Sequence, residues 1–143
     1  MNVPKPDQMK LRYYPDPVLF DKGADVTEFN AALKAAVRRM FEIMYESDGV
    51  GLAAPQVGWP GHLFVMAIAN EEKRAAHPDE APDYREICDE YVVINPRLMA
   101  KGDAQVVFEE GCLSFPGVRA KISRPDHVII EAQGLDGKSY PLS

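Results

Sequence analysis

The sequence predicts an α+β fold built mainly from antiparallel sheets. One long segment near the N-terminus has the periodicity of an amphipathic helix, and several short β-type runs separated by turn residues follow it. Strands that follow a helix in this way, without alternating with further helices, are typical of the α+β class. At 143 residues and 46% hydrophobic composition the chain has the size of one globular domain. We therefore expect a single domain over residues 1–143.

The N-terminal segment, from Met1 to Lys22, is rich in proline. Pro15 and Pro17 flank Asp16, and a proline both restricts its own φ and disfavours helix at the residue before it. This segment is expected to be extended or turn-like and to wrap around the domain.

The long helix is expected from about Thr27 to Ser47. Apolar residues recur there at helical spacing, with charged residues between them. Asp25 or Thr27 can cap its start, and Asp48-Gly49 supplies the turn that ends it. The apolar face comprises Phe29, Leu33, Ala36, Val37, Met40 and Met44.

The expected strands begin after a glycine-rich segment. His62–Ala69 has the composition of a buried strand, and Tyr91–Asn95 of another, which Pro96 should stop. Between them, Asn70–Glu90 is charged and lacks periodicity, so we expect a solvated loop in which Cys88 has no role. Further β-type runs lie at Gln105–Phe108, Val118–Ser123 and His127–Ala132, with a hairpin turn at Leu135–Gly137 leading into Lys138–Leu142.

Composition argues against several kinds of partner. The net charge of −6 and the pI near 5.0, without any Lys/Arg-rich run, argue against nucleic acid and anionic membranes. The apolar runs are far shorter than the roughly 20 residues that span a bilayer, and the start lacks the apolar core of a signal peptide. A cytoplasmic location follows, where Cys88 and Cys112 are expected to be reduced.

Two segments have the residue types of a chemical site. In Gly49–Gln56 (GVGLAAPQ), glycines permit close approach of a ligand, and the Gln56 amide can donate to a developing oxyanion. In Glu109–Ser114 (EEGCLS), Cys112 as a thiolate is a soft metal ligand, and Leu113 presents a backbone N–H beside it. From the residues alone, the alternative for the first segment is a helix-to-strand turn with an exposed Gln56. The alternative for the second segment is that Cys112 is a small buried residue without a chemical role.

Together, and in this order after a predicted helix, the two segments closely resemble those of the peptide deformylase family. The similarity extends from YYPDPVLF through MFEIMYESDG and VVINP to SRPDHVIIEAQGLDGK, nearly the whole chain. The resemblance implies a peptide-deformylase-like α+β fold. It also implies removal of the formyl group from N-terminal formylmethionine of nascent polypeptides near the ribosome, with a divalent metal, Fe²⁺ first and Zn²⁺, Ni²⁺ or Co²⁺ as alternatives.

The resemblance also implies roles for individual residues. Gln56 matches the oxyanion-stabilising glutamine, Cys112 the thiolate metal ligand, and Leu113 the residue whose N–H faces the formyl oxygen. Val50, Gly51 and Gly111 match positions that line the substrate channel. Arg119 matches an arginine near the entrance of the channel, and the alternative for Arg119 is a solvated surface charge.

The family's third motif, a His-Glu-x-x-His helix, is absent from this sequence. The histidines are His62, His77 and His127, and none lies four residues from another. His127 is not expected to substitute, and Glu109 and Glu110 are expected to cap or pair. The chain is therefore expected to be C-terminally incomplete, to lack the central metal-binding helix, to bind metal weakly and to be inactive as given.

Without that helix, apolar faces that include part of Leu63–Ala69 and Val128–Ile130 are expected to lack a packing partner and to be exposed. Two further interpretations remain open. One is a non-catalytic deformylase-like protein that recognises N-terminal methionine or a partner, and the other is a structural domain in which both segments are turns.

Overall fold

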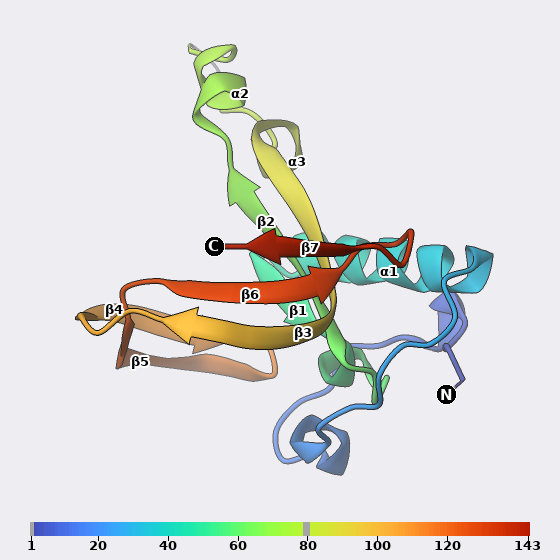
Figure 1. Ribbon diagram of the computed structural model, residues 1–143. Helices are drawn as coiled ribbons and strands as arrows, with labels where there is room; N and C mark the ends of the chain where they lie inside the picture. Colours follow the sequence, from blue (N-terminus) through green and yellow to red (C-terminus); the bar gives the residue numbers. More distant parts are fainter. Residues whose placement is uncertain (1, 79–80) are drawn as a thin grey trace.

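The computed structural model describes residues 2–78 and 81–143 and shows one long helix packed beside antiparallel sheets (Figure 1). A five-stranded sheet has the order β1-β2-β3-β6-β7, and β4 and β5 form a separate pair. The predicted α+β class with one long N-terminal helix is confirmed. The strands are β1 (Gly51–Ala53), β2 (Leu63–Ala69), β3 (Cys88–Lys101), β4 (Gln105–Cys112), β5 (Phe115–Pro125), β6 (Val128–Gln133) and β7 (Ser139–Leu142). The helices are α1 (Ala31–Glu46), α2 (Glu71–Ala75) and α3 (Tyr84–Ile87), with 3₁₀ turns η1 (Pro6–Gln8), η2 (Pro17–Phe20) and η3 (Ala54–Val57).

Helix α1 supplies one wall of the core. It begins at Ala31, because the extended residue Asn30 accepts a hydrogen bond from the Leu33 N–H at 3.0 Å. The expected cap at Asp25 or Thr27 is therefore wrong, whereas the end before Asp48 is as expected. The buried face packs with η3 and the first strands into one core cluster. Its side chains are Leu33, Ala36, Val37, Met40, Ile43 and Met44.

Strand β3 continues through Pro96, where the sequence predicts a stop. The pairing with β6 shifts register between Ile94 and Arg97, and Asn95 has a φ of 51°. The Asn95 side chain accepts from the Val26 N–H at 2.8 Å and donates to Gln133 at 2.7 Å. The proline is tolerated because it lies at this irregularity, where no ladder hydrogen bond from its nitrogen is needed.

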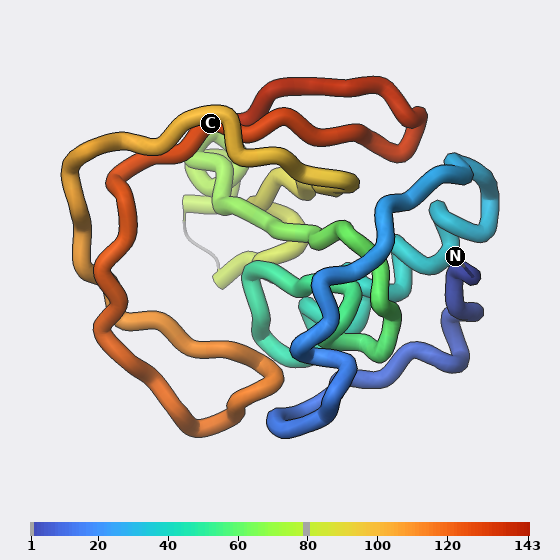
Figure 2. The backbone as a smooth tube through the Cα atoms, turned by 60° about the horizontal axis from the view of Figure 1, so that its bottom comes forward, coloured from blue at the N-terminus to red at the C-terminus, as the bar shows by residue number. Residues whose placement is uncertain are grey.

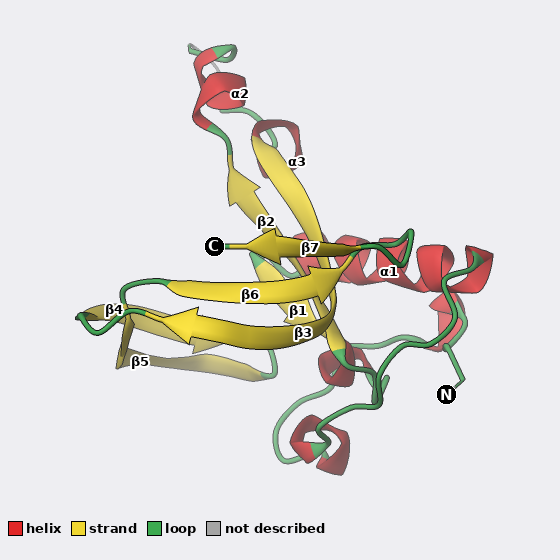
Figure 3. Ribbon diagram, viewed as in Figure 1, coloured by secondary structure: helices red, strands yellow, loops and turns green. Residues whose placement is uncertain are grey.

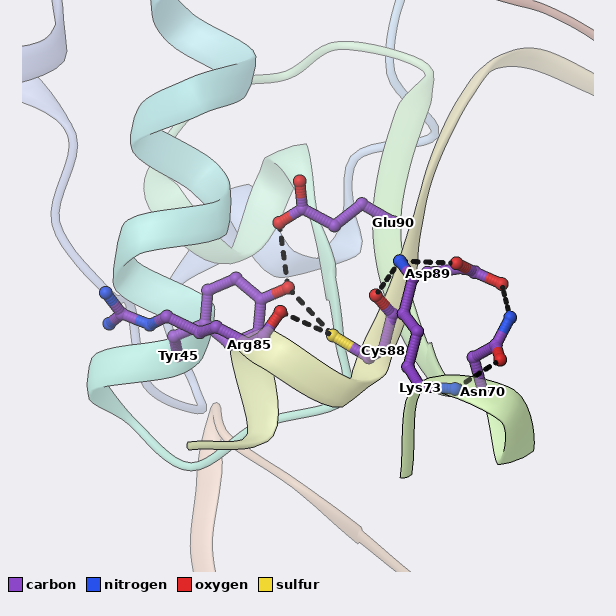
Figure 4. Close-up of polar contacts among 7 residues, drawn as sticks. All are labelled: Tyr45, Asn70, Lys73, Arg85, Cys88, Asp89 and Glu90. Atoms are coloured by element: carbon purple, nitrogen blue, oxygen red, sulfur yellow. Dashed lines mark hydrogen bonds and ion pairs between the residues drawn. The ribbon is translucent and has the colours of Figure 1, made fainter. Parts of the chain in front are cut away.

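The segment between β2 and β3 is more ordered than the expected loop. It contains α2 and α3, while residues 79–80 of the predicted loop lie outside the described residues. Cys88 is buried, and the Tyr45 hydroxyl lies 3.3 Å from its sulfur (Figure 4). Tyr45 also donates to Glu90 at 2.7 Å. Burial, followed by these hydrogen bonds, raises the pKa of Tyr45 far above its usual range. The expectation that Cys88 has no role is wrong, because it helps to attach this segment to α1.

The N-terminal segment is extended apart from two 3₁₀ turns, as predicted, and in Figure 2 it passes across the residues that follow α1. The Arg12 N–H donates to the Gln56 carbonyl at 2.7 Å, and the Tyr14 N–H to the Ser114 carbonyl at 2.8 Å. These two bonds attach the N-terminal segment both to the η3 turn and to the turn between β4 and β5.

The β4-β5 hairpin projects beside the larger sheet (Figure 3). Neither strand has a buried residue. The expected β-type runs at Gln105–Phe108 and Val118–Ser123 fall within β4 and β5 but are shorter than those strands, and the run at His127–Ala132 matches β6 with a shift of one residue. The predicted turn into β7 is present, with Gly137 at a φ of 77°.

Apolar residues are exposed on both of the expected faces. Val128 and Ile129 are 41% and 39% exposed. In β2, Ile68 is 51% exposed, whereas Leu63, Val65 and Ala67 are buried in the core, so only part of this strand is exposed, as expected. Among the described residues, no helix is long and apolar enough to cross a membrane.

Candidate active site

The amide of Gln56 is held in one orientation by its own local turn. Gln56 is the third residue of the short η3 turn, and its Oε1 accepts a hydrogen bond from the Ala53 N–H at 2.9 Å. Because Oε1 is occupied by a donor, Nε2 must face the other way. It lies 3.2 Å from Ser114 Oγ and 3.5 Å from Cys112 Sγ. The site therefore presents a neutral N–H donor beside a thiol.

Ser114 is a site residue that the sequence analysis does not single out. It is 4% exposed, and its hydroxyl accepts from Gln56 while its carbonyl accepts from Tyr14. A buried hydroxyl requires hydrogen-bond partners, and Ser114 has them. Its position directly after the Cys112–Leu113 pair was the available signal, but nothing local in the sequence shows that its partner is Gln56.

Cys112 and Leu113 lie where β4 ends. Cys112 is exposed and free of any disulfide, while the Leu113 side chain packs against the core. A Cβ on Gly49 would lie 2.6 Å from Leu113 Cδ1. The absence of a side chain at Gly49 therefore makes room for Leu113, so this glycine joins the two motifs rather than only allowing a ligand to approach.

One cavity of about 860 Å³, here called the site cavity, lies between the two segments. The sequence-predicted site residues all line it, although they come from two segments far apart in the chain. Val50 is 63% exposed, so this wall is open to a ligand. The predicted residues that line the cavity are Val50, Gly51, Gln56, Gly111, Cys112, Leu113 and Arg119.

The acidic residues ahead of Cys112 pair with arginines across the hairpin. Glu109 accepts from Arg119 at 3.1 Å, and Glu110 accepts from Arg124 through two hydrogen bonds, one of 2.7 Å. The bond from Arg124 lowers the pKa of Glu110. Pairing was the expected fate of both acids, and a carboxylate held ionised by arginine is poorly suited to take up a proton.

The described residues do not fit a complete catalytic metal site. Such sites normally use three protein ligands, but no group of three or more His, Cys, Asp or Glu side chains within residues 2–78 and 81–143 is arranged to hold a metal. His62 pairs with Asp25 at 2.8 Å and His127 with Asp126 at 3.0 Å, and neither histidine lines the site cavity. Cys112 is the thiol that lines the cavity; of the carboxylates that also line it, Glu109 and Glu110 pair with arginines, and Asp48 is exposed.

An amide N–H fixed beside a free thiol at an open cavity is the kind of site that hydrolases present to a carbonyl group. The chain belongs to the polypeptide deformylase family, whose model matches residues 8–142.

Curated relatives support this assignment. A peptide deformylase of Acidobacterium capsulatum is 43% identical over 129 residues, which are 90% of this chain and 68% of that protein. The chloroplastic/mitochondrial peptide deformylase 1B of Arabidopsis thaliana is 39% identical over 135 residues, 94% of this chain and 45% of the relative. The chain therefore spans less than half the length of this plant relative.

Solved structures agree with the fold. The peptide deformylase of Thermotoga maritima is 35% identical with a TM-score of 0.79, over 94% of this chain and 79% of that one. A probable peptide deformylase from Synechococcus phage S-SSM7 is 29% identical with a TM-score of 0.80, over 94% and 82% of the two chains.

Proposed function

We propose that this chain carries the formyl-binding part of a deformylase-type amide hydrolase, which acts on the N-terminal formylmethionine of nascent polypeptides. The observation that carries the proposal is the fixed Gln56 amide, whose Nε2 lies 3.5 Å from Cys112 Sγ at the site cavity. A formyl carbonyl placed there would meet a preorganised donor.

The chain's own residues would bind and polarise the formyl group. The Gln56 amide and the Leu113 N–H would both donate to the formyl oxygen, where negative charge develops during attack on the carbon. In other acyl-transfer enzymes each such donor contributes about 3 kcal/mol to the transition state. Val50, Gly51 and Gly111 would line the methionine channel, with Arg119 near its entrance.

The family is metal-dependent, and we propose Cys112 as one ligand of a divalent metal, ferrous iron first and zinc, nickel or cobalt as alternatives. One thiolate is short of the three ligands of a catalytic site, so no step of the reaction is assigned to a metal here. Residues 1–143 by themselves are proposed to hold metal weakly and not to turn over.

The proposed setting is the cytoplasm, near the ribosome, where formylated chains emerge. Cys88 and Cys112 are both free thiols, which suits a reducing compartment.

A second candidate is a non-catalytic protein that recognises N-terminal methionine or a partner. The incomplete set of metal ligands among the described residues favours it. The two candidates differ in whether the formyl group itself is recognised.

Binding of formyl-Met-Ala-Ser, compared with unformylated Met-Ala-Ser, tests the proposal. We expect the formylated peptide to bind more tightly and to shift the NMR resonances of Gly51 and Gly111. In Gln56→Glu, which cannot donate, this preference should be lost, whereas Gln105→Glu on the exposed β4 strand is the matched control.

Equal binding of both peptides would favour the second candidate, and no binding of either would overturn the proposal. Metal content and formyl-peptide hydrolysis are measured on the same sample. Stoichiometric metal with turnover would contradict the proposed weak binding.

A further inference from the structure

Two further cavities lie near the site cavity, and neighbouring cavities share lining residues. The first, of about 370 Å³, shares Asp48, Gly49 and Val50 with the site cavity. The second, of about 510 Å³, shares Tyr45 and Arg85 with the first. Together they are called the α1 groove. It leads from the candidate site toward the region between α1 and β3.

The outer wall of the α1 groove is an ordered part of the fold. The Arg85 guanidinium lies over the Tyr45 ring, 4.9 Å from its centroid (Figure 4). The Tyr84 ring meets the Tyr45 ring edge-on at 6.5 Å, and the Asp83 carboxylate caps α3 by accepting the Arg85 N–H at 3.0 Å. These contacts fix the wall before any ligand arrives.

The far end of the α1 groove is cationic around an apolar floor. Lys34, Arg38 and Arg85 line it, and none of the three forms an ion pair with another described side chain, in a chain whose net charge is −6. Of the two acids there, Glu42 is ion-paired with Arg39 at 3.2 Å, whereas Glu90 only accepts a hydrogen bond from the Tyr45 hydroxyl, so cations outnumber unpaired acids three to one. The apolar floor consists of Val37, Phe41, Val92 and Leu135.

The near end has a different charge. Asp48 lines the junction between the site cavity and the α1 groove, and it is exposed. A ligand that crosses this junction therefore meets a negative charge first and positive charges afterwards. Complementary charge adds to specificity and to the rate of association.

We infer that the α1 groove receives the substrate polypeptide downstream of its formylmethionine, and that it favours acidic and apolar residues in that part. The inference rests on the proposed function. A formylated N-terminus belongs to a longer chain, which advances by about 3.3–3.6 Å per extended residue, so residues after the first few must leave the site cavity. The apolar floor can contact the apolar side chains of a polypeptide. A nucleic acid backbone has no apolar groups that could contact this floor.

Three peptides with the same formyl-Met-Ala-Ser start test the inference on the isotope-labelled full chain. One is the tripeptide, one continues with alternating Leu and Glu, and one continues with alternating Leu and Lys. We expect the Glu peptide to bind about three- to tenfold more tightly than the Lys peptide at low salt, with the difference reduced by added salt. The Glu peptide should also shift the NMR resonances of Arg85 and Tyr45.

The double variant Arg38→Gln/Arg85→Gln should remove the difference between the Glu and Lys peptides while leaving tripeptide binding unchanged. Arg74→Gln, an exposed arginine on α2 outside the groove, is the matched control and should retain it.

The other outcomes are distinguishable. One outcome is that the tripeptide shifts the NMR resonances of Gly51 and Gly111 while the Glu peptide causes no further shift at Arg85. In that case the substrate chain does not pass through the α1 groove, and the proposed function stands. If the Glu peptide shifts Arg85 without Gly51, the groove is a separate site and the inference is wrong. Displacement of the tail by poly-uridine RNA as efficiently as by excess Glu peptide would also overturn it. Binding of none of the peptides would overturn the proposed function, and the inference with it.

Discussion

The half of the molecule around α1 and the β4-β5 hairpin are built on different principles. In the first, side chains such as Met40 and Val65 are fully buried in one core. In the second, no residue of either strand is buried, and Phe108 is 67% exposed. The candidate site takes Gln56 from the packed half and Cys112 from the hairpin. Its geometry therefore depends on the few contacts that join the two.

Three of these contacts are specific. Leu113 packs in the space left by Gly49, Ser114 accepts from the Gln56 amide, and the Tyr14 ring lies 5.0 Å from Phe115. Because the hairpin has no core of its own, we expect changes at the junction to move the site more than changes within the strands.

The largest effect is expected in the core of the packed half. Met40→Ala should lower the free energy of unfolding by about 2–5 kcal/mol, since it removes a fully buried side chain and leaves a cavity. Phe108→Ala on the hairpin should change it by less than about 0.5 kcal/mol. Urea unfolding measures both, and equal losses would contradict the contrast between the two regions.

The next effect is expected at the junction. Gly49→Ala would place a methyl group 2.6 Å from Leu113 Cδ1, and overpacking of this kind costs about 1–3 kcal/mol. Gly51→Ala, whose added Cβ would meet its nearest atom at 3.6 Å, is the control. Adding Leu113→Ala to Gly49→Ala should relieve the clash. If it does not, Gly49 acts through its backbone instead.

A smaller effect is expected from Ser114→Ala, which removes the hydroxyl that accepts from Gln56. The loss of one neutral hydrogen bond should cost about 1 kcal/mol, and the NMR signals of the Gln56 side-chain amide should move or broaden. Ser123→Ala on the exposed β5 strand serves for comparison. An unchanged Gln56 signal would show that Ala53 alone orients the amide.

The smallest change in the free energy of unfolding is expected when the pH is lowered, and it involves one carboxyl group in each of the two regions. A hydrogen bond from Asn70, followed by one from Lys73, lowers the pKa of Asp89, and Arg124 lowers the pKa of Glu110. A carboxyl with a lowered folded-state pKa stabilises the fold above its ordinary pKa and loses this contribution as pH falls through the lowered value. In Asp89→Asn and in Glu110→Gln, the free energy of unfolding should decrease less as the pH is lowered into the acid range. If neither variant changes the pH dependence of the free energy of unfolding, these two carboxyl groups do not contribute to it as expected.

Local pattern explains which parts of the fold were predictable. The apolar periodicity of α1 and the composition of β2 depend on neighbours within the same segment, and both elements are present, with α1 beginning at Ala31 rather than near Thr27. The start of α1 was misplaced because several polar residues near it can cap a helix. Strand β3 passes Pro96 because its partner β6 permits an irregularity there, which no local rule anticipates.

The sequence by itself determined the family and the residue types of the candidate site, because GVGLAAPQ and EEGCLS are short segments whose chemistry depends on the residues within them. Only the tertiary structure decided that Ser114 holds the Gln56 amide, that Gly49 makes room for Leu113, and that a second cavity shares Asp48, Gly49 and Val50 with the site cavity. Each of these depends on residues far apart in the chain, whose contact follows from how α1, the sheet and the hairpin pack together.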